Sequence, residues 1–156
     1  MKIISANWIV TCDENNSIIK NGAVVFNDKI EEINTLSNIE KKYPNIEIEK
    51  LPENSVLMPG LINSHVHLEF SGNTTTLKYG NFYSWLTSVI KHREDLITMA
   101  NTQLILSKLN KMKRTGTTTI GAISSYSYDL DACVKSPLNK VFFCEVIGTK
   151  GDMIDT

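Results

Sequence analysis

The chain has 156 residues, of which 42% are hydrophobic and 21% are charged, a composition typical of a soluble globular protein. Its formal net charge of −1 excludes binding to nucleic acid or to a membrane surface that is driven by electrostatics. No apolar run approaches the roughly 20 residues that a transmembrane helix needs, and residues 1–16 lack the continuous apolar segment of a secretory signal. We therefore expect a cytoplasmic protein of one ordinary domain or two small ones.

The three cysteines are too few and too far apart for a disulfide framework or a cysteine-rich zinc module. Cys12 and Cys144 lie in strand-like surroundings, where a free cysteine usually behaves as a small buried hydrophobic residue. We expect these cysteines to be structural.

Residues 1 to 54 predict a small β-rich head. The segment 3–12 alternates as a first strand, and residues 46–51 alternate as a later one. A single helical turn is expected shortly before Pro44, which cannot continue a helix. Turns are expected at residues 13–16, 21–22 and 27–28, of which the Asn-Gly pair at 21–22 is the strongest hairpin signal.

Two histidines follow a short apolar strand in the middle of the chain. The run Val56 to Met58 leads through a Pro-Gly turn into a second apolar pair and then to His65 and His67. Strand side chains alternate between faces, so residues 61–68 as a strand end would direct both imidazoles to the same side, about 6.6 Å apart along the chain. Two neutral imidazoles can hold one divalent metal ion, and catalytic zinc sites add further ligands and a water.

The second half of the chain alternates between strand and helix patterns. Apolar residues at helical spacing predict a helix over 82–92 and, after a polar break, a longer one ending near Arg114 and capped by Gly116. The β-branched run after Gly116 predicts a buried strand, a short helix is expected to open near Asp129, and residues 140–148 predict a third apolar strand. This order indicates an α/β fold with a parallel sheet.

Two of these stretches resemble one known family. The segment "LMPGLINSHVHLEF" resembles the first barrel strand of the amidohydrolase superfamily, and most of all its chlorohydrolase and aminofutalosine-deaminase-like branch. The "GTTT" at 116–119 is similar to the second barrel strand of the same superfamily. The resemblance implies a small β-sandwich head, residues 1–54, and the first three strand-helix units of a (β/α)8 TIM-like barrel, residues 55–156. A complete barrel needs ~250 residues, so the chain corresponds to an N-terminal portion of the family fold.

The function implied by this resemblance is metal-dependent hydrolysis of C–N bonds, as hydrolytic deamination of a purine-like or aminofutalosine-like small molecule. His65 and His67 would be two of the metal ligands. Zinc is the expected metal and iron the alternative, because imidazole suits both. The metal activates a water for attack on an amidine-like carbon, and a carboxylic acid protonates the departing amine. The family places the remaining ligands and this acid on later strands, so no catalytic residue is assigned here, and we expect the 156-residue chain alone to be inactive.

Three further residues are candidates for contact with the substrate. Glu69 shares the face of the histidines if the strand continues, and Glu145 ends the third strand, where barrels of this kind form their active sites. Tyr83 offers an aromatic wall for a purine. The alternatives are a solvated Glu69, a buried or salt-bridged Glu145 and a core Tyr83.

Two other functions remain open. Three parallel strands leave an edge free for pairing with another chain, so one alternative is a non-catalytic half-barrel that associates into a homodimer. The other is a binuclear amidase or cyclic-imide hydrolase, whose bridging lysine would also lie on a later strand.

Overall fold

The computed structural model describes residues 1–73 and 77–145. The chain divides into two compact units, Met1–Pro59 and Gly60–Thr156. Residues 55–59 fall in the first unit because β5 (Val56–Leu57) pairs with β1 (Lys2–Val10). A predicted third strand reaching residue 148 lies partly outside the described residues.

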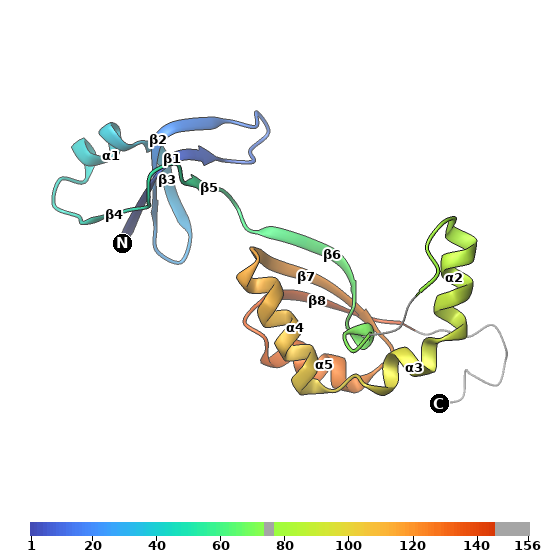
Figure 1. The fold of residues 1–156 in the computed structure, drawn as a ribbon. Helices are drawn as coiled ribbons and strands as arrows, with labels where there is room; N and C mark the ends of the chain where they lie inside the picture. The colour runs from blue at the N-terminus through green and yellow to red at the C-terminus, as the bar shows by residue number, and fades with distance from the viewer. Residues whose placement is uncertain (74–76, 146–156) are drawn as a thin grey trace. The chain divides into compact units, whose positions relative to one another are not determined.

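The first unit is one sheet built around β1 (Figure 1). Strand β2 pairs with β1 in the antiparallel sense and β3 pairs likewise with β2, while β4 and β5 both run parallel to β1. Adjacent residues Val24 and Val25 belong to two different hydrophobic clusters, so both faces of the sheet carry apolar side chains. The remaining elements of this unit are β2 (Ile18–Phe26), β3 (Ile30–Thr35), α1 (Leu36–Lys42) and β4 (Ile48–Lys50).

The predicted hairpin at Asn21-Gly22 is wrong, because both residues lie inside β2. The chain turns earlier, where the Asp13 carboxylate accepts hydrogen bonds from the N–H groups of Asn15 and Ser17 and from the Ser17 hydroxyl. These bonds, the Ser17 N–H most of all, hold the pKa of Asp13 below its usual value. Asn21 instead takes a positive φ of 46° within the strand, a conformation that asparagine tolerates.

The second unit contains a parallel sheet in the order β6-β7-β8, as predicted. Helices α4 and α5 connect its strands (Figure 1). This confirms the α/β class and the strand order expected from the sequence. The elements are β6 (Leu61–His67), the 3-10 turn η1 (Leu68–Phe70), α2 (Phe82–Lys91), α3 (Arg93–Thr98), α4 (Thr102–Arg114), β7 (Thr117–Ser124), α5 (Ser127–Lys135) and β8 (Asn139–Cys144).

The long helix predicted to end near Arg114 is divided in two. Helix α3 ends at Thr98 and α4 begins at Thr102, because the Asn101 side chain accepts the Leu104 N–H at 3.0 Å and caps the new helix. Gly116, with a φ of 98°, follows α4 as predicted.

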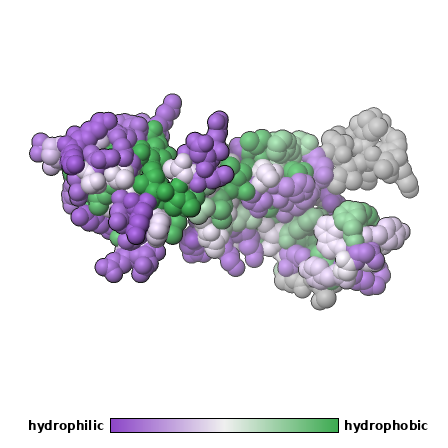
Figure 2. All heavy atoms as spheres, turned by 90° about the horizontal axis from the view of Figure 1, so that it is seen from above, coloured by the Kyte–Doolittle hydropathy of each residue, from purple (hydrophilic) through white to green (hydrophobic). Residues whose placement is uncertain are grey.

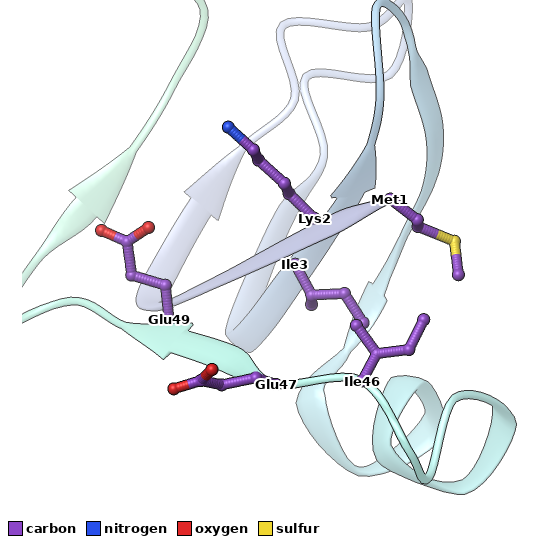
Figure 3. Close-up of a pocket in the computed structure, with 6 residues that line it drawn as sticks. All are labelled: Met1, Lys2, Ile3, Ile46, Glu47 and Glu49. Carbon is purple, nitrogen blue, oxygen red and sulfur yellow. The ribbon is translucent and has the colours of Figure 1, made fainter.

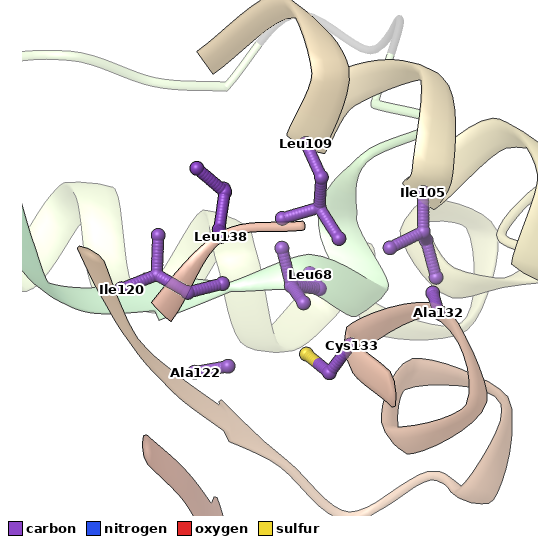
Figure 4. Packing of buried hydrophobic residues seen from close by; sticks show 8 residues of the cluster. All are labelled: Leu68, Ile105, Leu109, Ile120, Ala122, Ala132, Cys133 and Leu138. Atoms are coloured by element: carbon purple, nitrogen blue, oxygen red, sulfur yellow. The ribbon is translucent and has the colours of Figure 1, made fainter. Parts of the chain in front are cut away.

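The core of the second unit lies between its sheet and its helices. Side chains from η1, α4, β7, α5 and the segment between α5 and β8 meet in one cluster (Figure 4), which consists of Leu68, Ile105, Leu109, Ile120, Ala122, Ala132, Cys133 and Leu138. Burial raises the pKa of the Cys133 thiol, in keeping with a structural cysteine. The expected burial of Cys12 and Cys144 is wrong, because Cys12 stands in the loop after β1 and Cys144 is the exposed last residue of β8.

Hydrophobic side chains also reach the surface, as the green atoms in Figure 2 show. Helix α2 forms as predicted, yet its aromatic residues Phe82 and Tyr83 are exposed and Ser88 is its buried residue. The Ser88 hydroxyl donates to the carbonyl of Trp85 and accepts the N–H of Lys78. Helical spacing therefore located α2 but did not indicate burial.

Candidate metal centre

Polar residues converge at the carboxyl ends of the three parallel strands. His67 is the last residue of β6, Ser124 the last of β7, and Glu145 follows β8 directly. The Glu145 N–H donates to the Ser124 carbonyl at 3.0 Å, and the Ser125 hydroxyl donates to the Glu145 carbonyl at 2.6 Å. These bonds fix Glu145 beside the end of β7.

The two histidine rings lie next to each other, with centroids 5.2 Å apart and planes at 61°. The strand does not alternate simply here, because its pairing with β7 shifts between Asn63 and Val66. His65 is exposed, whereas His67 is partly buried. The two imidazoles therefore lie close together, as predicted, although the strand that carries them is irregular at its end.

Gly121 permits this irregularity. A Cβ atom at position 121 would lie 2.3 Å from the Ser64 carbonyl oxygen, so any side chain would displace the backbone of β6. An isolated glycine inside a strand pattern is a known signal for such a close approach. The sequence contained this signal in the stretch after "GTTT".

Glu69 is hydrogen-bonded to His67. The distance between His67 Nδ1 and Glu69 Oε1 is 2.9 Å, and the Glu69 side chain is 0% exposed in η1. The ligand atoms of His67, Glu69 and Glu145 all lie within 4.8 Å of one another. Because Nδ1 is engaged by the carboxyl group, Nε2 is the ring nitrogen of His67 that remains for a metal.

Several carboxyl oxygens in this region are buried without a hydrogen-bond partner among the described residues. They are Glu69 Oε2, Glu145 Oε2 and both oxygens of Asp129. Burying a polar atom without a partner costs free energy, about 1–3 kcal/mol in mutational data. Imidazole nitrogens and carboxylate oxygens are zinc ligands in proteins, so this donor set fits a divalent metal ion.

Asp129 was not identified from the sequence as a site residue. It lies on α5 and is fully buried, which raises its pKa to about 6. The Ser124 hydroxyl and the Glu69 backbone oppose that rise, although neither meets the carboxyl group with hydrogen-bond geometry. The nearby Glu69 carboxyl adds to the rise. The sequence signal that could have identified Asp129 is its place as the acidic residue in the first turn of α5, the helix that follows the carboxyl end of β7.

The predicted aromatic candidate lies on a different element. Tyr83 is 77% exposed on α2, and a side chain so exposed does not wall an enclosed pocket within the described part of the chain. The first unit has a hollow of about 440 Å³ lined by Met1, Lys2, Ile3, Ile46, Glu47 and Glu49 (Figure 3). No histidine lines it, so we place the candidate site at the strand ends of the second unit.

Comparison with known families identifies the family of this chain. The sequence profile of the amidohydrolase family matches residues 56–150, which include both histidines and the "GTTT" strand. The chain belongs to the amidohydrolase family. The resemblance inferred from the two strand motifs is therefore confirmed, and with it membership of a metal-dependent family.

Relatives of known activity agree with this assignment. The chain is 49% identical over 155 residues to the aminodeoxyfutalosine deaminase of a Nitratiruptor species, covering 99% of this chain and 37% of that protein. It is 35% identical over 149 residues to a Helicobacter pylori adenosine deaminase, covering 95% of this chain and 36% of that one. The crystal structure of Helicobacter pylori aminofutalosine deaminase in complex with methylthio-coformycin superimposes with a TM-score of 0.86 at 34% identity, over 96% of this chain and 36% of that one.

The chain thus spans little more than a third of the length of the curated relatives it matches. The matched structure confirms the predicted fold, a partial barrel of the amidohydrolase type. In the described residues no helix has the length and apolar character that crossing a membrane requires.

Proposed function

We propose that this chain is part of a metal-dependent hydrolase that deaminates an aminofutalosine-like or purine-like small molecule. The observation that carries the proposal is the adjacent pair His65 and His67 beside the buried Glu69, in a chain 49% identical to an aminodeoxyfutalosine deaminase. The family membership supports a hydrolytic reaction. The name of that relative supports the substrate class.

We propose His65 and His67 as the metal ligands of this chain, with residues 1–54 as a head and residues 55–156 as part of the barrel. Zinc is the proposed metal and iron the alternative, because imidazole nitrogens and carboxylate oxygens are ligands for both. A divalent ion supplies Lewis acidity and an activated water near neutral pH. The residues of this chain hold and orient that centre, and the acid that protonates the leaving amine is not assigned to any of them.

Glu145 and Tyr83 remain candidates for contact with the substrate. Glu145 stands at the carboxyl end of β8, within 4.8 Å of the ligand atoms of His67 and Glu69, which supports such a contact. Tyr83 is supported by its aromatic side chain alone. The burial of Glu69 favours an action through His67 over direct contact with a substrate.

The test of this proposal is metal content and deaminase activity in the purified full-length protein, with His65→Ala and His67→Ala as variants. We expect each variant to lose most bound metal and at least 100-fold in activity, because each removes one ligand. His92→Ala is the matched control, since His92 lies at the end of α2 and should leave both quantities unchanged. Metal bound at wild-type level in both ligand variants would contradict the assignment.

A non-catalytic, self-associating half-barrel is the second candidate. Within the described residues β6 and β8 each pair with β7 alone, so both are edge strands. Ile62 on β6 and Val141 and Phe143 on β8 are exposed, which favours pairing with another chain.

A further inference from the structure

We propose that Glu69 is a positioning residue that holds His67 with Nδ1 engaged and Nε2 free for the metal. The inference rests on the proposed function and deepens it, because it assigns to Glu69 a role that acts on the metal through His67. It predicts that metal affinity depends on the reach of the Glu69 side chain as well as on its chemistry.

The geometry of the pair supports this role. Glu69 Oε1 lies 2.9 Å from His67 Nδ1, and the His67 side chain is 28% exposed. A ring nitrogen that donates to a carboxyl group is fixed as the protonated one, so the opposite nitrogen carries the lone pair. Carboxyl groups bonded to ligating histidines orient the ring and raise the basicity of the ligating nitrogen.

The backbone around Glu69 is anchored in the core. Leu68, its neighbour in η1, is 1% exposed and belongs to the main hydrophobic cluster of the second unit. The Ser71 N–H donates to the Leu68 carbonyl at 2.9 Å and closes the turn. The Phe70 ring lies 5.7 Å from the His67 ring and so borders it as well. These contacts keep the Glu69 side chain from turning toward solvent.

The burial of Glu69 is unfavourable for the fold by itself. Its Oε2 has no hydrogen-bond partner among the described residues, and its other oxygen bonds to His67. An apolar or amide side chain would avoid part of this cost. A residue that is costly to bury and bonded to a candidate ligand fits a role in metal binding better than a role in stability.

The experiment compares Glu69→Gln and Glu69→Asp in the full-length protein. The glutamine variant keeps the shape of the side chain but replaces the carboxyl group, and the aspartate variant keeps the carboxyl group but is one methylene shorter. Zinc affinity is measured by competition with a chelator, and thermal unfolding is measured on the metal-free protein. Glu94→Gln is the control, because Glu94 is an exposed acid on α3 of the same unit.

We expect both Glu69 variants to bind zinc at least 10-fold more weakly, while metal-free Glu69→Gln melts no lower than wild type. Affinity within twofold of wild type in both variants would overturn the inference and leave the proposed function intact. A lower melting temperature of metal-free Glu69→Gln with unchanged zinc affinity would make Glu69 a structural residue. A raised KM with unchanged zinc affinity would make it a substrate contact. Absence of zinc binding by the wild type would overturn the proposed function together with the inference.

Discussion

At the scale of one residue, the burial of Asp129 in this site lowers the stability of the folded state near neutral pH. It is buried beside Glu69 and Ser124, and burial raises its pKa from the usual value of 3.8 to about 6. The folded state therefore binds the Asp129 proton more tightly than the unfolded state does. Stability must accordingly fall as the pH rises from about 4 to about 6, and the whole penalty is present above that range.

Replacing Asp129 with asparagine should remove this penalty. The shift of about two pH units corresponds to up to about 3 kcal/mol, so Asp129→Asn should exceed wild type in unfolding free energy by up to that amount at pH 7.5. The two proteins should be nearly equal at pH 4. Urea unfolding of the metal-free proteins at both pH values checks this, with the exposed neighbour Asp131→Asn as control. A difference between Asp129→Asn and wild type that is the same at both pH values would contradict the assignment.

At the scale of one element, strand β6 departs from regular alternation just where it carries the histidines. The pairing shift before Val66 brings the Ser64 carbonyl to within 2.3 Å of the position that a Cβ atom of residue 121 would occupy. The placement of His65 and His67 therefore depends on a glycine in the neighbouring strand. This contact joins two residues that are distant along the chain.

Gly121→Ala should disturb both stability and metal binding. The new methyl group meets backbone atoms, which yield less readily than a side chain, so we expect a loss of about 1–3 kcal/mol in unfolding free energy. We also expect weaker zinc binding, because β6 must shift at its histidines. Thr118→Ala, at an exposed position of β7, is the control for chemical denaturation and chelator competition. Wild-type zinc affinity in Gly121→Ala would show that the histidines do not depend on this contact.

At the scale of the whole molecule, the three-stranded sheet has two edges among the described residues. Edge strands with exposed apolar side chains pair readily with other chains. Ile62 on β6 is 70% exposed, and Val141 on β8 is 55% exposed. Such edges favour association of the 156-residue chain when it is present by itself.

We expect this chain to form a dimer whose population rises with concentration, measured by sedimentation velocity. Val141→Lys should shift the equilibrium toward the monomer, because a charge on an edge strand opposes pairing. Leu130→Lys on α5 is the control and should leave the equilibrium unchanged. A chain that stays monomeric at every concentration would exclude the half-barrel candidate.

Local patterns in the sequence were sufficient for the strand order of the second unit and for the proximity of the histidine pair. Strand and helix patterns depend on residues within a few positions of each other, and the structure confirms the strands β6, β7 and β8, the helix α2 and the position of Gly116 after α4. The family assignment also came from local motifs, the strand with both histidines and the "GTTT" strand. Two of the errors were local as well. Asn21-Gly22 did not form the hairpin because Asp13 closed an earlier turn, and Asn101 divided a helix that apolar spacing had joined.

The sequence by itself determined the fold class, the family and the proximity of the two histidines, because each of these is encoded in short segments. Tertiary structure alone decided that Glu69 is buried against His67 and that Asp129 is buried near Glu69. It also decided that Gly121 allows the close approach of the β6 backbone. The physical reason is that burial and contact are set by packing between elements far apart along the chain. No periodic pattern in the local sequence shows which side chains are buried by that packing.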